Sequence, residues 1–215
     1  MTPRAVIFDC DGVLVDSEPM TDEVIATNLA RHGLVLPPER ISSLFLGGTI
    51  SGLGDTARTM GADLPHDWLD GMYAEIFERL AQGTPLIDGI DTVLDALDAA
   101  NIAYGVGSNG SHRKMGITLG QHPAVYERLK GRLFSRHDVS APKPDPALYL
   151  HAAAALNVSP ADCAVIEDSP TGCKAAARAG MRCFGYAPRD NGSRLAAEAA
   201  IVFHDMRRLP ELLGL

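Results

Sequence analysis

Acidic side chains directly follow two short apolar runs of the sequence. Asp9 and Asp11 come after the run AVIF, and Glu167 and Asp168 come after the run AVI. A parallel strand that is buried on both faces reads as a short apolar run, and ligands bind beyond the carboxyl ends of such strands. The sequence therefore predicts that these four carboxylates lie together at one edge of a sheet.

Further polar residues belong to the same predicted edge. Ser108 and Asn109 follow the apolar run Ile102–Val106, and Lys143 lies between two prolines in a loop that leads into a helix. Taken alone, a D-x-D pair is more often a turn or a helix cap, and a single lysine is more often solvated. The joint placement of all these residues at one edge favours a functional site.

Four neighbouring carboxylates cannot all stay ionised unless a cation lies among them. Mg²⁺ fits best, because it takes one or two protein carboxylates, keeps waters and leaves a position for a phosphoryl oxygen. An EF-hand calcium loop is excluded by its spacing, because the glycine required at its sixth position would be Leu14. With Mg²⁺ on one side and Lys143 on the other, the site would hold a dianion.

Apolar runs and helical patterns alternate along most of the chain. The helical pattern is clearest at Ile90, Val93, Leu94 and Leu97, which repeat at i, i+3, i+4 and i+7. Other helices are expected over 146–156, from Ser169-Pro170 to Gly180, and at the C-terminus. The predicted strands are Ala5–Phe8, Ile102–Val106, Leu133–Phe134, Ala164–Ile166, Arg182–Gly185 and Ile201–Phe203. This alternation predicts an α/β fold with a doubly wound parallel sheet.

Residues 16–85 interrupt the alternation because they show helical patterns only. One helix is expected around Val24–Leu29, ending at Gly33, and a second carries apolar residues at Leu69, Met72, Tyr73, Ile76, Phe77 and Leu80. A glycine-rich loop is expected between them, with Gly47, Gly48, Gly52 and Gly54. We therefore expect residues 1–15 and 86–215 to form the core domain and residues 16–85 to form an inserted helical domain.

The composition excludes several classes of protein. The chain has 215 residues, 46% of them hydrophobic and 21% charged, values typical of a globular protein and not of a disordered or fibrous one. The start of the chain carries no signal-peptide pattern, and we expect a cytoplasmic protein, a monomer or a homodimer. The four cysteines show no CxxC spacing and are expected to be reduced.

The net charge is −8, and residues 16–85 contribute −7 of it, since they hold four arginines, no lysine and eleven acidic residues. No basic surface for nucleic acid or anionic membranes is therefore expected. Such an acidic insertion is also expected to disfavour ligands that carry several phosphates.

Four sequence motifs resemble, in order, those of the haloacid dehalogenase superfamily: FDCDGVLVDSE, VGSNG, KPDP and VIEDSPTG. Within the superfamily they are similar to the branch of phosphosugar phosphatases and β-phosphoglucomutases, in which a helical cap follows the first motif. The resemblance implies a Rossmann-like core and a Mg²⁺-dependent phosphatase. The substrate it implies is a small phosphorylated metabolite of the sugar phosphate, phosphogluconate or phosphoglycolate type.

The resemblance also implies roles for individual residues. Asp9 would be the nucleophile that forms a phospho-aspartyl intermediate, and Asp11 would be the general acid and base. The Asp9 carboxylate, the Asp11 backbone carbonyl and Asp168 would bind the metal, with Glu167 holding a metal-bound water.

The phosphoryl group would contact Ser108, Asn109, Gly110 and Lys143, where a helix begins. The residues that select the leaving group are less well defined by the motifs, because they belong mainly to the inserted domain. The candidates are Glu18, Thr21, Arg40, Thr49 and Arg58 in the insertion, and His112 and Arg113 in the core.

A phosphosugar mutase is the main alternative, because it shares every core motif. Mutases of this branch carry a histidine ten positions beyond the acid/base aspartate and a basic residue in the cap loop. Here those positions are Thr21 and, approximately, Leu46, which favours hydrolysis. A haloalkanoate dehalogenase needs no residue equivalent to Asp11, so the presence of Asp11 argues against that activity.

Two other classes share part of the pattern. Gly105–Gly110 matches G-x-G-x-x-G, but the acidic residue expected about 20 positions later, Glu127, lies in a helical pattern, which argues against a dinucleotide-binding oxidoreductase. A receiver-type signalling domain also gathers Asp, Ser or Thr and Lys around Mg²⁺, but it is smaller and has no cap. Multiple rapid turnovers would distinguish an enzyme from such a switch.

Overall fold

The computed structural model describes residues 2–37, 40–41, 44, 49–198 and 200–215. The chain divides into two compact units, one of Met1–Asp16 with Pro85–Leu215 and one of Ser17–Thr84. Leu46, Gly47 and Gly48, which the sequence singled out, lie outside the described residues.

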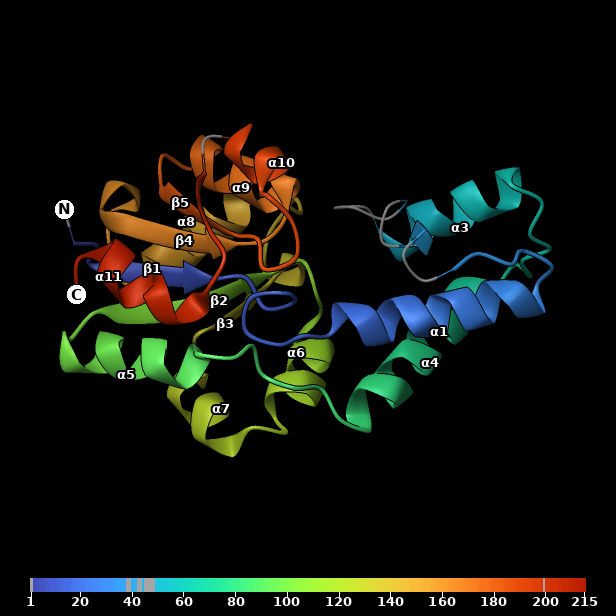
Figure 1. Cartoon of the computed structure of the whole chain (residues 1–215), viewed down its shortest axis with the longest axis horizontal. Coiled ribbons are helices and arrows are strands. Elements are labelled where there is room, and N and C mark those ends of the chain that lie inside the picture. Colours follow the sequence, from blue (N-terminus) through green and yellow to red (C-terminus); the bar gives the residue numbers. More distant parts are fainter. Residues whose placement is uncertain (1, 38–39, 42–43, 45–48, 199) are drawn as a thin grey trace. The chain divides into compact units, whose positions relative to one another are not determined.

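The first unit, the core unit, contains one parallel sheet of six strands (Figure 1). Its order is β3-β2-β1-β4-β5-β6, so β1 lies between β2 and β4. A doubly wound sheet of this order has its topological switch point beside β1, and ligands bind at the carboxyl ends of the strands there. The α/β fold predicted from the sequence is confirmed. The strands are β1 (Ala5–Phe8), β2 (Ala103–Ser108), β3 (Leu133–Ser135), β4 (Cys163–Glu167), β5 (Arg182–Tyr186) and β6 (Ile201–Phe203).

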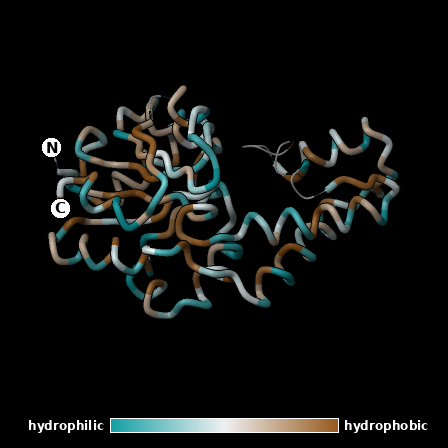
Figure 2. The backbone as a smooth tube through the Cα atoms, in the orientation of Figure 1, coloured by the Kyte–Doolittle hydropathy of each residue, from teal (hydrophilic) through white to brown (hydrophobic). Residues whose placement is uncertain are grey.

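Alternate residues of each strand face two hydrophobic layers, because successive side chains of a strand point to opposite faces. Val6 and Phe8 belong to one layer and Ala5 and Ile7 to the other, and all four are fully buried. Hydrophobic stretches, brown in Figure 2, accordingly lie inside the core unit. The first layer is closed by α5 (Ile90–Ala99), α6 (His112–Leu119), α7 (Pro123–Leu129) and α11 (Leu209–Leu213), and the second by α8 (Ala147–Ala155), α9 (Pro170–Arg178) and α10 (Ser193–Ala196).

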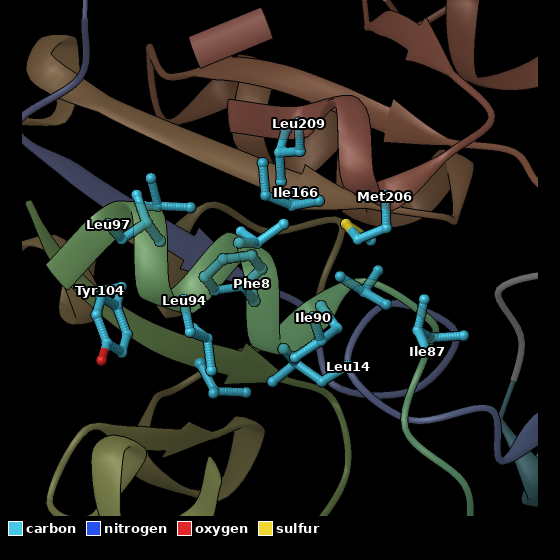
Figure 3. Close-up of a cluster of buried hydrophobic side chains, with 14 of the residues drawn as sticks. Phe8, Leu14, Ile87, Ile90, Leu94, Leu97, Tyr104, Ile166, Met206 and Leu209 are labelled. Carbon is cyan, nitrogen blue, oxygen red and sulfur yellow. The ribbon is translucent and has the colours of Figure 1, made fainter. Parts of the chain in front are cut away.

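The first layer packs around α5, whose predicted stripe of Ile90, Val93, Leu94 and Leu97 is fully buried. Figure 3 shows Phe8 of β1 among these side chains, together with residues of the C-terminal segment. On the other face, α8 approaches β2 closely at Gly107, where an added Cβ would lie 3.2 Å from the Tyr149 ring. This close approach brings Tyr149 beside the carboxyl ends of the central strands.

The second unit, the helical unit, contains α1 (Glu18–Arg31), α3 (Ile50–Thr59) and α4 (Trp68–Ala81). The buried face of α4 repeats every fourth residue: Trp68, Met72, Ile76 and Leu80. The sequence correctly predicted a helix here but included Tyr73 in its apolar face, and that residue is 38% exposed. Trp68 extends the buried row of Met72, Ile76 and Leu80 by one turn toward the N-terminus of the helix, and Tyr73 lies outside that row.

The expectation that Gly52 and Gly54 belong to a loop is wrong, because both lie within α3. Thr49 caps this helix by accepting a hydrogen bond from the Gly52 N–H at 3.1 Å. A Cβ at Gly54 would lie 2.7 Å from the Trp68 ring, so glycine is required here for close packing against α4 and not for a turn.

All four cysteines are buried and free. In the described ranges, no helix has the length and the apolar composition needed to cross a membrane.

A buried hydrogen-bond network joins α1 to α4. Asn28 is only 3% exposed; its Oδ1 accepts from the Trp68 indole N–H at 2.7 Å, and its Nδ2 donates to Glu75 Oε1 at 3.1 Å. Glu75 also pairs with Arg31. An unpaired buried donor is costly, so these bonds fix how α1 and α4 pack.

We expect Asn28→Ala to destabilise the helical unit by about 1–3 kcal/mol, because the indole N–H of Trp68 would lose its acceptor. Trp68 is the only tryptophan of the chain, so urea unfolding followed by its fluorescence reports on this unit. Thr27→Ala, at the exposed neighbouring position, is the control. Equal unfolding midpoints for the two variants would show that the network contributes nothing.

Candidate active site

The candidate site is built where β1, β2 and β4 end. Phe8 of β1 pairs with Val106 of β2 and with Ile166 of β4, so the residues that follow lie at one edge. Asp9 donates its backbone N–H to the carbonyl of Ile166 at 2.9 Å, which continues the pairing beyond β1. This register places Asp9 beside Glu167, the last residue of β4.

Lys143 joins these two carboxylates. Its Nζ lies 2.6 Å from Asp9 Oδ1 and 2.6 Å from Glu167 Oε1, and the residue is only 6% exposed. The ammonium also lies 4.7 Å from the centre of the Tyr149 ring, and the Tyr149 hydroxyl donates to Glu167 Oε1 at 2.7 Å. The loop residue Lys143 therefore completes a buried cluster with residues from both strands and from α8.

Asn109 holds the backbone of Lys143 in place. Its Oδ1 accepts from the Lys143 N–H at 3.0 Å, and its Nδ2 donates to the Lys143 carbonyl at 3.4 Å. The sequence predicts that Asn109 binds phosphate, but in the structure its side chain hydrogen-bonds to the Lys143 backbone and thereby positions this lysine.

Both oxygens of Glu167 are fully used by the protein. Oε1 accepts from Lys143 and Tyr149, and Oε2 accepts from the backbone N–H of Asp168 and from the N–H and hydroxyl of Ser169, at 2.8–3.1 Å. Ser169 is also the N-cap of α9, accepting from the Gly172 N–H at 3.1 Å. Glu167 is consequently fixed in one orientation.

The pKa values of Asp9 and Glu167 are shifted in opposite directions. Burial raises the pKa of Asp9 to about 7; the Lys143 ammonium opposes this rise, and the Glu167 charge adds to it. Burial alone would raise the pKa of Glu167, but the Lys143 charge and the donated hydrogen bonds hold it below its usual value. Burial would lower the pKa of Lys143, and the two carboxylates raise it above its usual value instead.

Asp11 and Asp168 meet at a tight turn beyond β1. Gly12 has a left-handed backbone (φ +79°), and a Cβ added there would lie 2.0 Å from Asp168 Oδ2. The turn closes through the Gly12 N–H, which donates to the Val15 carbonyl at 2.8 Å. Only glycine allows the Asp168 carboxylate to approach the backbone next to Asp11 this closely.

The charge balance of this edge fits a divalent cation. Lys143 faces Asp9 and Glu167, and Lys114 Nζ lies 2.8 Å from Asp11 Oδ1. With Asp168 included, two ammonium groups stand against four carboxylates, which leaves two negative charges when all are ionised. Asp9 and Asp168 could bind a cation with the backbone carbonyl of Asp11, as hard cations prefer oxygen ligands. Across the described residues, no set of three or more His, Cys, Asp or Glu side chains is arranged as a metal cluster.

A helix N-terminus faces the same edge beyond β2. Ser108 Oγ accepts from the Gly110 N–H at 2.9 Å, and the Gly110 carbonyl accepts from the Ser135 hydroxyl at 2.7 Å. Ser111 caps α6 by accepting from the Lys114 N–H at 3.2 Å. The start of a helix favours bound anions, because its backbone N–H groups and its dipole point toward them.

The other sequence candidates have different surroundings. In the core unit, His112 is exposed and its Nε2 lies 2.8 Å from Asp138 Oδ2, whereas Arg113 is exposed. In the helical unit, Glu18 and Arg40 are exposed, the Thr21 hydroxyl donates to the Ser17 carbonyl, Thr49 caps α3, and Arg58 forms a surface pair with Asp55.

Sequence reasoning did not assign Lys114, Tyr149 or Ser169 to the site. Each contacts an acidic residue that was assigned: Lys114 contacts Asp11, and the other two contact Glu167. Lys114 and Tyr149 lie within helices, where their sequence positions give no signal of these contacts, whereas Ser169 directly follows VIED.

Comparisons with known proteins agree on one family. The model of the haloacid dehalogenase-like hydrolases matches residues 3–180. The chain is 31% identical to 6-phosphogluconate phosphatase of Escherichia coli K12 over 97% of this chain and 94% of that protein, and 28% identical to hexitol phosphatase A of the same organism over 97% and 94%.

Solved structures show the same fold. A conserved haloacid dehalogenase-like protein of unknown function from Agrobacterium tumefaciens has a TM-score of 0.87 at 29% identity, covering 98% of this chain and 97% of that one. A family hydrolase from Deinococcus radiodurans, solved with bound phosphate and sodium, has a TM-score of 0.82 at 29% identity, covering 99% and 97%.

We expect Gly172→Ala and Gly116→Ala, both within helices, to have opposite effects on stability. A Cβ at Gly172 would lie 1.7 Å from Glu167 Oε1, so Glu167 would have to leave its partners, at a cost of about 3 kcal/mol or more. At Gly116 nothing lies within 4 Å, and alanine should stabilise α6 by up to about 1 kcal/mol. Urea unfolding of both variants checks this, and a Gly172→Ala protein as stable as the wild type would contradict the placement of Glu167.

Proposed function

Because the chain belongs to the haloacid dehalogenase-like hydrolases, we propose that it is a Mg²⁺-dependent phosphatase that hydrolyses a small phosphate monoester through a phospho-aspartyl intermediate on Asp9. The observation that carries this proposal is the buried cluster of Asp9, Lys143 and Glu167 at the switch point of the sheet. A carboxylate at this edge, held by an ammonium and beside a helix N-terminus, is suited to attack a phosphoryl group.

Asp9 acts as the nucleophile in the first step. One of its carboxylate oxygens bonds to phosphorus while the bond from phosphorus to the leaving oxygen breaks, and the electron pair of that bond stays on the leaving oxygen. Asp11 donates its proton to this oxygen, so the leaving group departs as an alcohol.

Asp11 acts as the base in the second step. It takes a proton from a water molecule, whose oxygen attacks phosphorus and breaks the bond to Asp9. Inorganic phosphate leaves, and the Asp9 carboxylate is regenerated. Asp11 therefore acts in both steps and is protonated again at the end of each turnover.

Three groups of the core unit are suited to bind the phosphoryl oxygens. The Ser108 hydroxyl accepts from the Gly110 N–H, so its own hydrogen can be donated to a ligand. Lys143 supplies positive charge, and the first turn of α6 supplies backbone N–H groups. Asn109 contributes by holding the Lys143 backbone.

The residues that would hold Mg²⁺ are Asp9 and Asp168 through their carboxylates and Asp11 through its backbone carbonyl, which matches the excess of two negative charges. The ion would keep Asp9 ionised and offset charge on the phosphoryl oxygens. Glu167, whose oxygens are taken up by the protein, would orient the surrounding groups.

We further propose that the helical unit is a cap that selects the leaving group. Relatives named for phosphatases of 6-phosphogluconate, hexitol and N-acetylmuramic acid 6-phosphate support a sugar phosphate or sugar acid phosphate as substrate. Thr21, where mutases of this branch carry a histidine, supports release of free phosphate instead of its return to a sugar.

The first test is phosphate release by the Asp9→Asn variant. We expect a loss of more than about 10⁴-fold, since the amide cannot form the intermediate. Asp91→Asn, an exposed carboxylate of α5, is the matched control and should keep full activity. Chelation of divalent cations should abolish wild-type activity, and added Mg²⁺ should restore it. An Asp9→Asn enzyme with more than about a tenth of wild-type activity would exclude Asp9 as the nucleophile.

The second test is a substrate panel of phosphosugars, phosphoglycolate, 6-phosphogluconate and a sugar bisphosphate. The acidic helical unit predicts faster turnover of monophosphates than of the bisphosphate, because like charges repel. In the same panel, β-glucose 1-phosphate is assayed for glucose 6-phosphate. Formation of that product without free phosphate would identify a mutase, and faster turnover of the bisphosphate would contradict the role of charge.

A further inference from the structure

Lys114 occupies an electrostatically unfavourable position. It lies in the first turn of α6, three residues after the N-cap Ser111, where the helix dipole disfavours a cation. Its side chain is nevertheless only 21% exposed and turns toward the edge of the sheet. Because the helix dipole does not stabilise this ammonium, another side chain must stabilise it.

That partner is Asp11. Lys114 Nζ lies 2.8 Å from Asp11 Oδ1, and the Asp11 side chain is itself 23% exposed. A pair with this little exposure is screened far less than a surface ion pair.

The pair lies beside the proposed phosphoryl site. A Cβ added at Gly110 would lie 3.1 Å from Ser108 Oγ, 3.5 Å from Lys114 Cδ and 3.6 Å from Asp11 Oδ2. Atoms of these three side chains therefore all lie within 3.6 Å of one point beside Gly110. Lys143 cannot replace Lys114 here, because its ammonium already contacts Asp9 and Glu167.

We propose that Lys114 is a positioning residue for Asp11, holding its carboxyl group beside the leaving oxygen and stabilising the charge that forms on it during proton transfer. The inference rests on the proposed phosphatase function. As the bond from phosphorus to the leaving oxygen breaks, the proton of Asp11 moves to that oxygen and Asp11 becomes a carboxylate. An ammonium already at hydrogen-bond distance stabilises this carboxylate without reorganisation.

This role makes the effect of Lys114 depend on the leaving group. An alkyl phosphate needs a proton on its leaving oxygen, whereas p-nitrophenyl phosphate releases a stable anion that needs none. Loss of Lys114 should therefore slow the attack on alkyl phosphates and leave the attack on p-nitrophenyl phosphate nearly unchanged. A merely structural role would slow both reactions equally.

The experiment compares kcat/KM of Lys114→Met with that of the wild type for p-nitrophenyl phosphate and for the most reactive alkyl phosphate of the panel. We expect a loss of about 100-fold with the alkyl phosphate and less than about 5-fold with p-nitrophenyl phosphate. Lys114→Arg, which keeps the charge, should lose less than Lys114→Met. Lys130→Met removes a lysine from an exposed pair with Glu127 and should match the wild type.

A double variant shows whether Lys114 acts through Asp11. In the Asp11→Asn background no carboxylate remains to be stabilised, so adding Lys114→Met should change kcat/KM by less than about 3-fold. Thermal unfolding verifies that each variant is folded, and Lys114→Gln replaces Lys114→Met if the latter is not.

Equal losses on both substrates, or an additive loss in the double variant, would overturn the inference while leaving the phosphatase intact. A folded wild-type protein that releases phosphate from neither substrate with Mg²⁺ would instead overturn the proposed function itself.

Discussion

One buried ammonium, that of Lys143, has to neutralise two carboxylates that come from different strands. The rest of the core unit is arranged to keep these three groups together: the register of β1 and β4 sets Asp9 beside Glu167, and Asn109 clamps the lysine backbone. The compensation is incomplete, since two ammonium groups stand against four carboxylates at this edge when all are ionised. The contacts that hold the ends of β1 and β4 together thus also arrange the side chains of the proposed active site.

The sequence predicted the sheet well, because buried parallel strands leave short apolar runs, and it predicted which polar residues follow them. It could not predict which partner each residue takes. Asn109 binds the Lys143 backbone, and Lys114 reaches Asp11 from a helix turn whose local pattern is that of an ordinary cap. Such contacts join residues far apart in the chain, so the spacing of residues within a motif does not reveal them.

The helical unit was predicted less accurately, for a related reason. The sequence favours a loop at Gly54 because glycine is common in turns, yet this residue lies in α3 against the Trp68 ring. The choice between a turn and a close helix contact depends on the neighbouring helix, which the local sequence does not contain. The proposed substrate contacts have the same difficulty, because Arg58 is one of these candidates and its described partner is the surface carboxylate of Asp55.

The central claim is that Asp9 becomes covalently phosphorylated during turnover. The most direct test is to quench the enzyme during steady-state turnover, reduce it with borohydride and map the peptides by mass spectrometry, since reduction converts a phospho-aspartate to homoserine. The account predicts homoserine at position 9 and at no other aspartate. Homoserine at a different position, or none while phosphate is released at full rate, would contradict it.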